Sequence, residues 1–473
     1  MNDDSKTPLD EALMEWALGE RLAGQTPPDL RAAVRRRLAE ASPAAATPST
    51  RRLLAIAAAV LFGTAVVFAV AWSRRQSASD DRAATAPQDP SPPARVSSRA
   101  AIEALPDDTQ HVIGTGIVDD DVPALLRLRH LETLELHAIF GSPLTPGQTL
   151  RPMHTLTDEG LARLASLKQL RVLHLGNQTE IGAAGLDMLA HLPHLEELVV
   201  QTCTADDEAF SVLSRMPHLA VLRLNGCTKI GEPTIARIAA IGTLRGLSLA
   251  ACGHLQQEWL TKLAAMQRLE LLDLGMIGSN TIFSGISPVD LPAPGTGVTD
   301  EVLRAIGKMR SLRHLDLSYA GITSAGLREL QHLPLVDLDL TGIDVPSEGL
   351  LQLPPTLEKL SLRGTTVSHA DLGSTLADAT PRLRTLVLDS SSGIGDAQLR
   401  SLAALPGLRR LDISYCRNVT AAGFASLTGL PALEELTMRG QCTFLDDDGT
   451  RLVVQAMPRL RRFVTDKEPS ERR

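Results

Sequence analysis

The sequence predicts an α/β repeat solenoid, with a curved parallel sheet on its concave face and short helices on its convex face, preceded by one transmembrane helix. Three observations support this prediction. A leucine pattern recurs every 22–26 residues over most of the chain, an apolar stretch at 53–72 carries no charge, and aromatic residues make up only 3 %. With so few aromatics, a core must be filled by many similar aliphatic side chains, as in stacked repeats.

Charge is distributed unevenly along the chain of 473 residues. Residues 1–99 carry 13 Lys and Arg against 11 Asp and Glu, whereas residues 100–473 carry 34 against 44, a net charge of −10. A protein that binds nucleic acid needs a positive surface, often with aromatic side chains. The acidic second part therefore argues against nucleic acid as a ligand.

Residues 1–50 are predicted to form a cytosolic helical head. One helix is expected over 9–22, and a second begins after Thr26 and the two prolines that follow it, which is a typical helix start. In composition this segment resembles the short cytosolic heads of bacterial anti-sigma-like membrane proteins, although residues 1–99 contain neither His nor Cys. The resemblance implies that the head docks a cytosolic partner, and a basic head at the membrane surface is the alternative.

The uncharged stretch 53–72 is predicted to cross a membrane. A helix of this length spans about 30 Å, which matches the hydrocarbon core of a bilayer. Five arginines lie close before the stretch and three close after it, so the N-terminus is expected in the cytosol and the repeats outside the cytoplasm. Residues 73–100 are rich in Ser, Ala and Pro, and they are expected to form a disordered tether.

A repeat domain is predicted over 101–468. Each repeat opens with the pattern LxxLxLxxC and continues with [IV]TDxGLxxLxxLPxL. The leucines at positions 4 and 6 alternate with polar residues, which predicts a half-buried strand, and the second half has the cap and spacing of a helix. The repeats start at Leu131, Leu170, Leu195, Leu219, Leu244, Leu269, Leu312, Leu335, Leu357, Leu383, Leu408 and Leu433.

This pattern resembles the leucine-rich repeat family in its cysteine-containing form. The resemblance implies a non-catalytic scaffold that binds a protein partner on its concave face or on the rim that carries two long inserts. The repeats are also similar to the substrate-binding part of F-box ubiquitin-ligase receptors, although no F-box helices precede them. A third alternative is a transmembrane regulator whose head, 1–50, sequesters a cytosolic factor.

The five cysteines are expected to be buried thiols. Cys227, Cys252 and Cys416 occupy position 9 of their repeats, where the family places Asn or Cys to turn the chain inward. No CxxC pair is present, so neither a zinc site nor a thioredoxin-like motif is predicted. A disulfide between consecutive repeats is not expected, because side chains on neighbouring parallel strands point in the same direction.

The two inserts lengthen their repeats to 39 and 43 residues. They lie near 138–155 and 276–297, at the same point of the repeat, and should therefore emerge on one rim of the solenoid. Each contains one of the chain's few aromatics, Phe140 and Phe283. Long loops on a rigid scaffold often bind partners; a tolerated insertion without function is the alternative.

Position 5 of each strand is expected to point to the concave face. Asp273, Asp316 and Asp339 occupy this position in consecutive repeats, on strands expected about 4.8 Å apart. Asp337 adds a carboxylate at position 3, and Tyr319 follows the strand of Asp316. Because neighbouring like charges destabilise a sheet, this acidic stripe of three aspartates predicts a basic or cation-bearing partner. A solvated Leu-Asp-Leu variant is the alternative.

No catalytic residue, metal site or cofactor is predicted. The sequence contains no GxSxG, P-loop or HExxH motif, and no paired acid and base can be named. The sequence therefore predicts a single-pass membrane protein whose leucine-rich solenoid recognises another protein without catalysing a reaction.

Overall fold

The structure is a computed structural model that describes residues 92–140, 152–178, 180–277, 297–367, 369–440, 456–457, 459–465 and 470–471. The chain divides into two compact units, Met1–Arg75 and Gln76–Arg473, and all described residues belong to the second. The predicted head, 1–50, the predicted span, 53–72, and most of the predicted tether, 73–100, lie outside the described residues and stay predictions as domains.

One sheet of sixteen strands runs through the second unit. Its strands follow one another in chain order, and neighbours pair in parallel except for the last two, which are antiparallel. The strands are β1 (Ala94–Val96), β2 (His111–Thr115), β3 (Thr133–His137), β6 (Val172–Gly176), β7 (Glu197–Gln201), β8 (Val221–Arg223), β9 (Gly246–Ser248), β10 (Leu271–Asp273), β11 (His314–Asp316), β12 (Asp337–Asp339), β13 (Lys359–Ser361), β14 (Thr385–Val387), β15 (Arg410–Asp412), β16 (Glu435–Thr437), β17 (Arg462–Val464) and β18 (Ser470–Glu471).

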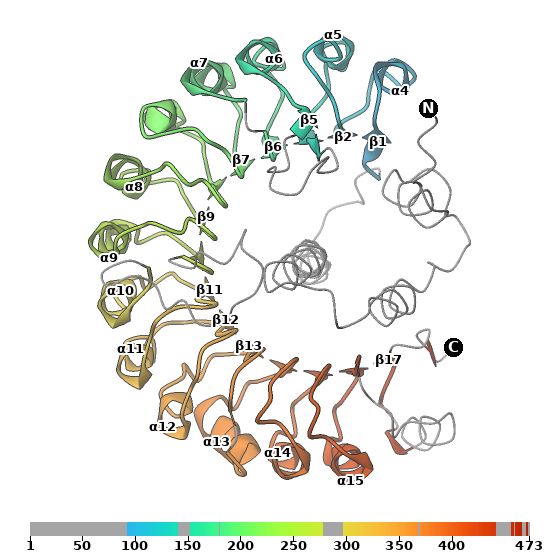
Figure 1. Cartoon of the computed structure of the whole chain (residues 1–473), viewed down its shortest axis with the longest axis vertical. Coiled ribbons are helices and arrows are strands. Elements are labelled where there is room, and N and C mark those ends of the chain that lie inside the picture. Colours follow the sequence, from blue (N-terminus) through green and yellow to red (C-terminus); the bar gives the residue numbers. More distant parts are fainter. Residues whose placement is uncertain are drawn as a thin grey trace, which may run out of the picture. The chain divides into compact units, whose positions relative to one another are not determined.

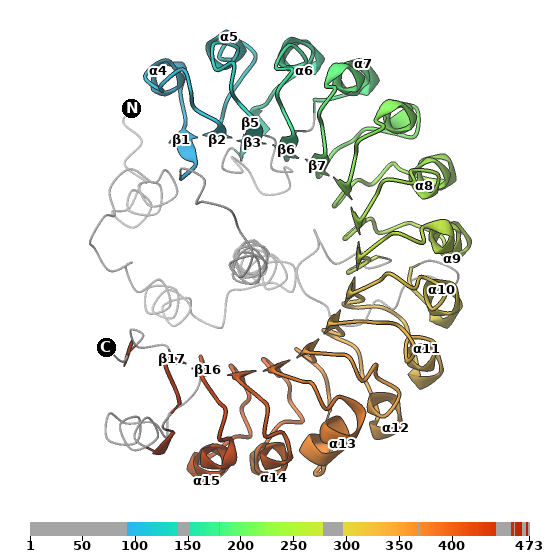
Figure 2. The same ribbon diagram turned by 180° about the vertical axis from the view of Figure 1, so that it is seen from behind.

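Short helices occupy the other side of each repeat (Figures 1 and 2). The α-helices are α4 (Arg99–Glu103), α5 (Val122–Leu125), α6 (Asp158–Leu164), α7 (Ala183–Met188), α8 (Glu232–Ala239), α9 (Gln257–Leu260), α10 (Asp300–Ile306), α11 (Ser324–Arg328), α12 (Ser347–Leu350), α13 (Leu372–Ala379), α14 (Asp396–Ser401) and α15 (Ala421–Ser426). Several end in 3-10 turns, and one repeat uses a 3-10 helix alone: η2 (Leu189–His191), η3 (Ala209–Arg215), η4 (Thr261–Ala265), η6 (Leu402–Ala404) and η7 (Leu427–Gly429).

The curvature of these repeats follows from the sizes of their two sides. Parallel strands lie about 4.8 Å apart, whereas packed helices need about 10 Å. One strand and one helix per repeat therefore force the sheet to the inner side of an arc and the helices to the outer side, as Figure 1 shows. The predicted α/β solenoid, with strands on the concave face and helices on the convex face, is confirmed for the described repeats.

The core is a ladder of leucines between the sheet and the helices. In a typical repeat, Leu312, Leu315 and Leu317 are at most 3 % exposed, and Leu327 from the following helix packs against them. The equivalent leucines of the repeats before and after cover the two sides that these residues would otherwise expose, because a single repeat is too thin to bury its own apolar side chains. Stability is therefore shared between neighbouring repeats.

In several repeats the position-9 side chain donates a hydrogen bond to the preceding repeat, at Cys227, Cys252, Ser391 and Cys416. The Cys252 thiol donates to the Leu224 carbonyl at 3.0 Å, and the Ser391 hydroxyl donates to the Leu362 carbonyl at 2.8 Å. All four described cysteines are free thiols, and burial raises the pKa of Cys252 to about 12. The sulfur atoms of Cys203 and Cys227 lie 2.9 Å apart, so neighbouring side chains approach more closely than their parallel directions suggested. The fifth cysteine, Cys442, lies outside the described residues.

On the convex side, a second set of polar contacts joins consecutive helices. The Asp396 carboxylate, at the first position of α14, accepts hydrogen bonds from the Thr420 backbone N–H at 2.8 Å and from its hydroxyl at 2.6 Å. The same hydroxyl oxygen accepts from the Ala422 N–H and so caps α15. These interrepeat Asp–Thr pairs recur at Asp119–Thr157, Asp300–Thr323 and Asp344–Thr366.

Two features of the sequence prediction differ in detail. Regular structure begins at β1, within the segment expected to be a tether, because Val96 is buried against the first repeat and pairs with β2. The first insert, expected as a loop, begins and ends in an antiparallel strand pair, β4 (Ile139–Phe140) and β5 (Pro152–His154). Most of the second insert lies outside the described residues.

The expectation of a single-pass membrane protein with extracytoplasmic repeats is corrected. In the part of the chain that the structure describes, no helix combines the length and the apolar character needed to cross a membrane. The helices of the solenoid are short because each one must turn back into a strand within a single repeat, and the predicted span at 53–72 lies outside the described residues. A membrane localisation is therefore not retained.

We expect Asp396→Ala to lower the free energy of unfolding by about 1–2 kcal/mol, because it removes two charge-assisted hydrogen bonds at a half-exposed site. Asp378, exposed on α13, is a matched control, since it has no partner among the described residues; Asp378→Ala should change stability by less than about 0.5 kcal/mol. Urea denaturation of both variants tests this. Equal losses would show that the Asp–Thr pairs do not stabilise the fold.

The same pair predicts a pH dependence. Hydrogen bonds from Thr420 lower the pKa of Asp396 in the folded state, whereas the unfolded chain has an ordinary carboxyl pKa of about 3.9. The stabilising effect is therefore complete above that value and disappears as pH falls through the lowered folded pKa. The stability difference between wild type and Asp396→Ala, measured in urea from pH 7 to pH 3, should shrink only in the acid range; a constant difference would contradict the hydrogen-bond assignment.

Candidate protein-binding surface

The predicted register of the concave face is confirmed by the strand pairing. Position-5 residues stand side by side from β3 to β16, and Asp273 pairs with Asp316, which pairs with Asp339. The residue before each aspartate on its strand points into the core and is at most 3 % exposed: Leu272, Leu315 and Leu338. The three aspartates are half-buried. The strands β10, β11 and β12 thus bring the acidic stripe together.

Each aspartate of the stripe also holds the turn that ends its strand. Asp316 accepts hydrogen bonds from the Ser318 backbone N–H at 2.9 Å and from its hydroxyl at 2.6 Å. Asp339 accepts from the Thr341 N–H at 2.9 Å, and Asp273 from the Gly275 N–H at 3.0 Å. This is the local Asx turn, in which a carboxylate bonds to the backbone two residues ahead. The donors of these turns are neutral, so the turns position the carboxylates without neutralising them.

A row of hydroxyl and amide groups extends the stripe on both sides. The Ser248 hydroxyl lies 2.8 Å from Asp273 and 2.6 Å from the Asn225 side-chain oxygen. On the other side, the Thr341 and Ser361 hydroxyls lie 3.0 Å apart. The stripe is therefore the charged centre of a longer polar row.

Asp337 is neutralised by its own neighbours on the concave face. Its carboxylate lies 2.9 Å from the Lys359 ammonium and 3.9 Å from a His314 ring nitrogen. Burial raises the pKa of Asp337, but the His314 hydrogen bond and the attraction of Lys359 outweigh it, so the pKa lies below its usual value. Asp337 belongs to an internal ion pair on the concave face.

Of the remaining predicted residues, Tyr319 lies at the rim, the edge of the solenoid where the strands end. Tyr319 has a left-handed backbone, with φ of 61°, and is 50 % exposed. Its ring lies against Gly342, whose φ is 73°; a Cβ there would come within 2.6 Å of the ring. Phe140 ends β4, and nothing further is described of its side chain; Phe283 lies outside the described residues.

A charged cluster near the N-terminal end of the concave face escaped the sequence analysis. His174 lies 3.2 Å from Glu197 and 3.8 Å from Glu135, and Arg223 lies 3.8 Å from Glu197. Burial lowers the pKa of His174, but the hydrogen bonds that it donates to the Glu135 and Glu197 carboxylates outweigh this effect and raise the pKa. The sequence contains a signal for this cluster, but it joins different repeat positions on neighbouring strands: Glu197 stands at position 3, one strand away from His174 at position 5.

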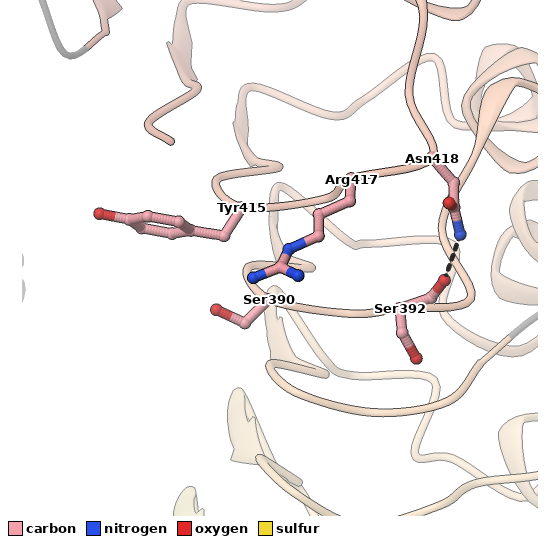
Figure 3. A pocket seen from close by; sticks show the side chains of 5 residues that line it. All are labelled: Ser390, Ser392, Tyr415, Arg417 and Asn418. Atoms are coloured by element: carbon pink, nitrogen blue, oxygen red, sulfur yellow. Dashed lines mark hydrogen bonds between the residues drawn. The ribbon is translucent and has the colours of Figure 1, made fainter. Parts of the chain in front are cut away.

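A pocket at the rim was also missed. Five polar residues from the loops after β14 and β15 line a cavity of about 410 Å³, which Figure 3 shows: Ser390, Ser392, Tyr415, Arg417 and Asn418. The available signal was a second Leu-Asp-[Leu/Ile]-Ser-Tyr sequence, ending at Tyr415, that matches the one ending at Tyr319.

The described ranges contain no group of three or more His, Cys, Asp and Glu side chains arranged to hold a metal ion. The concave face offers carboxylates, hydroxyls and a few compensating cations, all held by the sheet. Such a surface can bind a complementary protein surface through charge and hydrogen bonds.

Comparison with known proteins agrees with the repeat geometry. The family model described as leucine-rich repeat matches residues 308–330. This description supports a leucine-rich repeat family and names no subtype, so the cysteine-containing form stays a prediction. No curated protein matches the chain.

Solved structures similar to this chain include the complex of Rad7 and Elc1 in yeast, with 16 % identity and a TM-score of 0.48 over 70 % of this chain and 81 % of that one. Another is an internalin, inlF, from Listeria monocytogenes, with 17 % identity and a TM-score of 0.40 over 66 % of this chain and 82 % of that one.

Proposed function

We propose that this protein is a non-catalytic recognition scaffold that binds a basic protein partner on its concave face. The observation that carries the proposal is the register of Asp273, Asp316 and Asp339 on three adjacent strands. Their charges lie side by side, and the cost of that repulsion falls when a cationic surface covers them.

The rigidity of the sheet supports this proposal. Each stripe carboxylate is fixed by an Asx turn, and each strand is paired on both sides. A surface that is already ordered loses little conformational entropy when it binds, so more of the interaction energy appears as affinity. The net charge of −10 over 100–473 would also accelerate the encounter with a basic partner at low salt.

The rim would complete the interface. Tyr319 is half-exposed next to the stripe, and tyrosines are enriched among the residues that dominate binding energy. The two inserts, near 138–155 and 276–297 with Phe140 and Phe283, begin at the same rim. We include them in the proposed interface as contacts at the edge of the partner.

Replacing all three stripe aspartates by Asn tests the proposal. Asn keeps the side-chain oxygen that accepts from the backbone two residues ahead, so the turns persist while three charges are lost. We expect the dissociation constant of a partner captured by the full-length chain to rise at least tenfold, since an exposed charge pair contributes up to about 1 kcal/mol. Capture followed by biolayer interferometry provides the measurement.

Asp412→Asn is the matched control, because Asp412 forms the same turn with the Ser414 N–H at 2.9 Å but has Val387 and Thr437 as its strand neighbours. It should leave the affinity within twofold. A triple variant that binds as tightly as the control, with an unchanged salt dependence, would place the partner elsewhere and refute the proposed surface.

A further inference from the structure

The rim pocket is a second candidate site, separate from the acidic stripe. It opens where β14 and β15 end, and its lining comes from two consecutive loops (Figure 3). The guanidinium of Arg417 points toward the loop that carries Ser390 and Ser392, and the Tyr415 side chain extends to one side of it. The cavity of about 410 Å³ has room for an amino-acid side chain with part of its backbone.

Arg417 is the one charged residue among the five that line the pocket. Its side chain is exposed, and it has no ion-pair partner in the described part of the chain. Asp389, which precedes Ser390 of the pocket lining in the sequence, is buried and already paired with the Arg363 guanidinium at 2.9 Å. The Ser390 hydroxyl also donates to Asp389, at 2.7 Å. The charge of Asp389 is therefore balanced inside the repeat, and that of Arg417 is directed outward.

The pocket walls are held in place before any ligand arrives. The Asn418 side-chain amide donates to the Ser392 carbonyl at 2.6 Å (Figure 3), and a parallel bridge joins Gly395 to Asn418. Gly393 packs so closely on the preceding repeat that a Cβ there would lie 2.2 Å from the Val367 carbonyl oxygen. The two loops thus form one fixed surface.

Tyr415 supplies an aromatic wall of the pocket. Its backbone is left-handed, with φ of 58°, and its side chain is 47 % exposed. The ring lies against Gly440, where a Cβ would come within 2.4 Å of it. The same left-handed backbone recurs at this position of other repeats, including Thr202, Met276, Tyr319 and Ser390, so it belongs to the repeat turn, which here holds the tyrosine ring at the rim.

We propose that the rim pocket binds a carboxylate of an acidic peptide. One guanidinium matches one carboxylate in charge and in its two-point geometry. A phosphate, with nearly two charges, would be left half neutralised by Arg417 alone. Ser390 and Ser392 lie on the loop toward which the guanidinium points, and the Tyr415 ring, to one side of it, would face the residue next to the carboxylate.

The repeat of Tyr319 is an internal control. Tyr319 has the same left-handed backbone and half-exposed ring, and it follows Leu-Asp-Leu-Ser where Tyr415 follows Leu-Asp-Ile-Ser. Gly321 stands where the later repeat has Arg417, and the loop is one residue shorter, so Asn418 has no equivalent. The tyrosine alone is therefore present there without the cation.

Ligand-observed saturation-transfer NMR on the full-length protein tests the assignment. The probes are the acetylated, amidated tetrapeptide Gly-Leu-Glu-Gly and versions with Gln or phosphoserine in place of Glu. We expect millimolar binding of the Glu peptide that weakens with salt. Arg417→Gln should weaken it about fivefold or more and Tyr415→Ala by a similar factor, whereas Tyr319→Ala should have no effect.

Equal binding of the Glu and Gln peptides, or binding that Arg417→Gln leaves unchanged, would overturn the proposal. Absence of any signal with the wild type would do the same, and tighter binding of phosphoserine would replace carboxylate by phosphate. Thermal unfolding of the exposed Arg417→Gln variant should match the wild type, which separates lost binding from lost folding. Because the three stripe aspartates are absent from this pocket, the Asn variant of the stripe should bind the Glu peptide normally. The two proposed sites are therefore tested independently of each other.

Discussion

The leucines of this solenoid are fully buried only when the repeats on either side of their own are in place, and the other features of the fold depend on that constraint. It requires that strands pair in register and that helices repeat at the same spacing. Polar contacts between neighbouring repeats therefore recur at the same repeat positions, both behind the sheet and between the helices. Position 9 provides a hydrogen-bond donor behind the sheet, as Cys252 does. The Asp–Thr pairs, such as Asp396 with Thr420, join the helices on the convex side.

Much of this order could be predicted from the sequence because period and position are one-dimensional properties. The spacing of Leu315 and Leu338 predicts strand register directly, and with it the alignment of Asp316 and Asp339. The segment before residue 101 was harder, because β1 is a strand of three residues that is stabilised by pairing with β2 rather than by its own pattern. The localisation inferred from the apolar stretch at 53–72 found no support in the described helices.

The chemistry of the surface was less predictable, because hydrogen-bond partners depend on side-chain direction. The sequence indicates a carboxylate at Asp316 but not that Ser318 fixes it, and it does not distinguish Asp316 from Asp337, which Lys359 neutralises. The rim pocket combines positions 8 and 10 of one repeat with positions 8, 10 and 11 of the next. No motif within either repeat predicts that combination, because the pocket forms only where the two repeats stack on each other.

Pairing in strict chain order also determines how far the effect of a bound molecule can reach. In the sixteen-stranded sheet, each strand from β2 to β17 pairs only with the strand before and the strand after it in that sheet, so the energy of the array is close to a sum of adjacent terms. A molecule that clamps β11 protects β10 and β12 from local opening, and this protection fades with each further repeat. The stripe at β10–β12 and the rim at β14–β15 are thus expected to bind independently, so that occupation of one site leaves the affinity of the other unchanged.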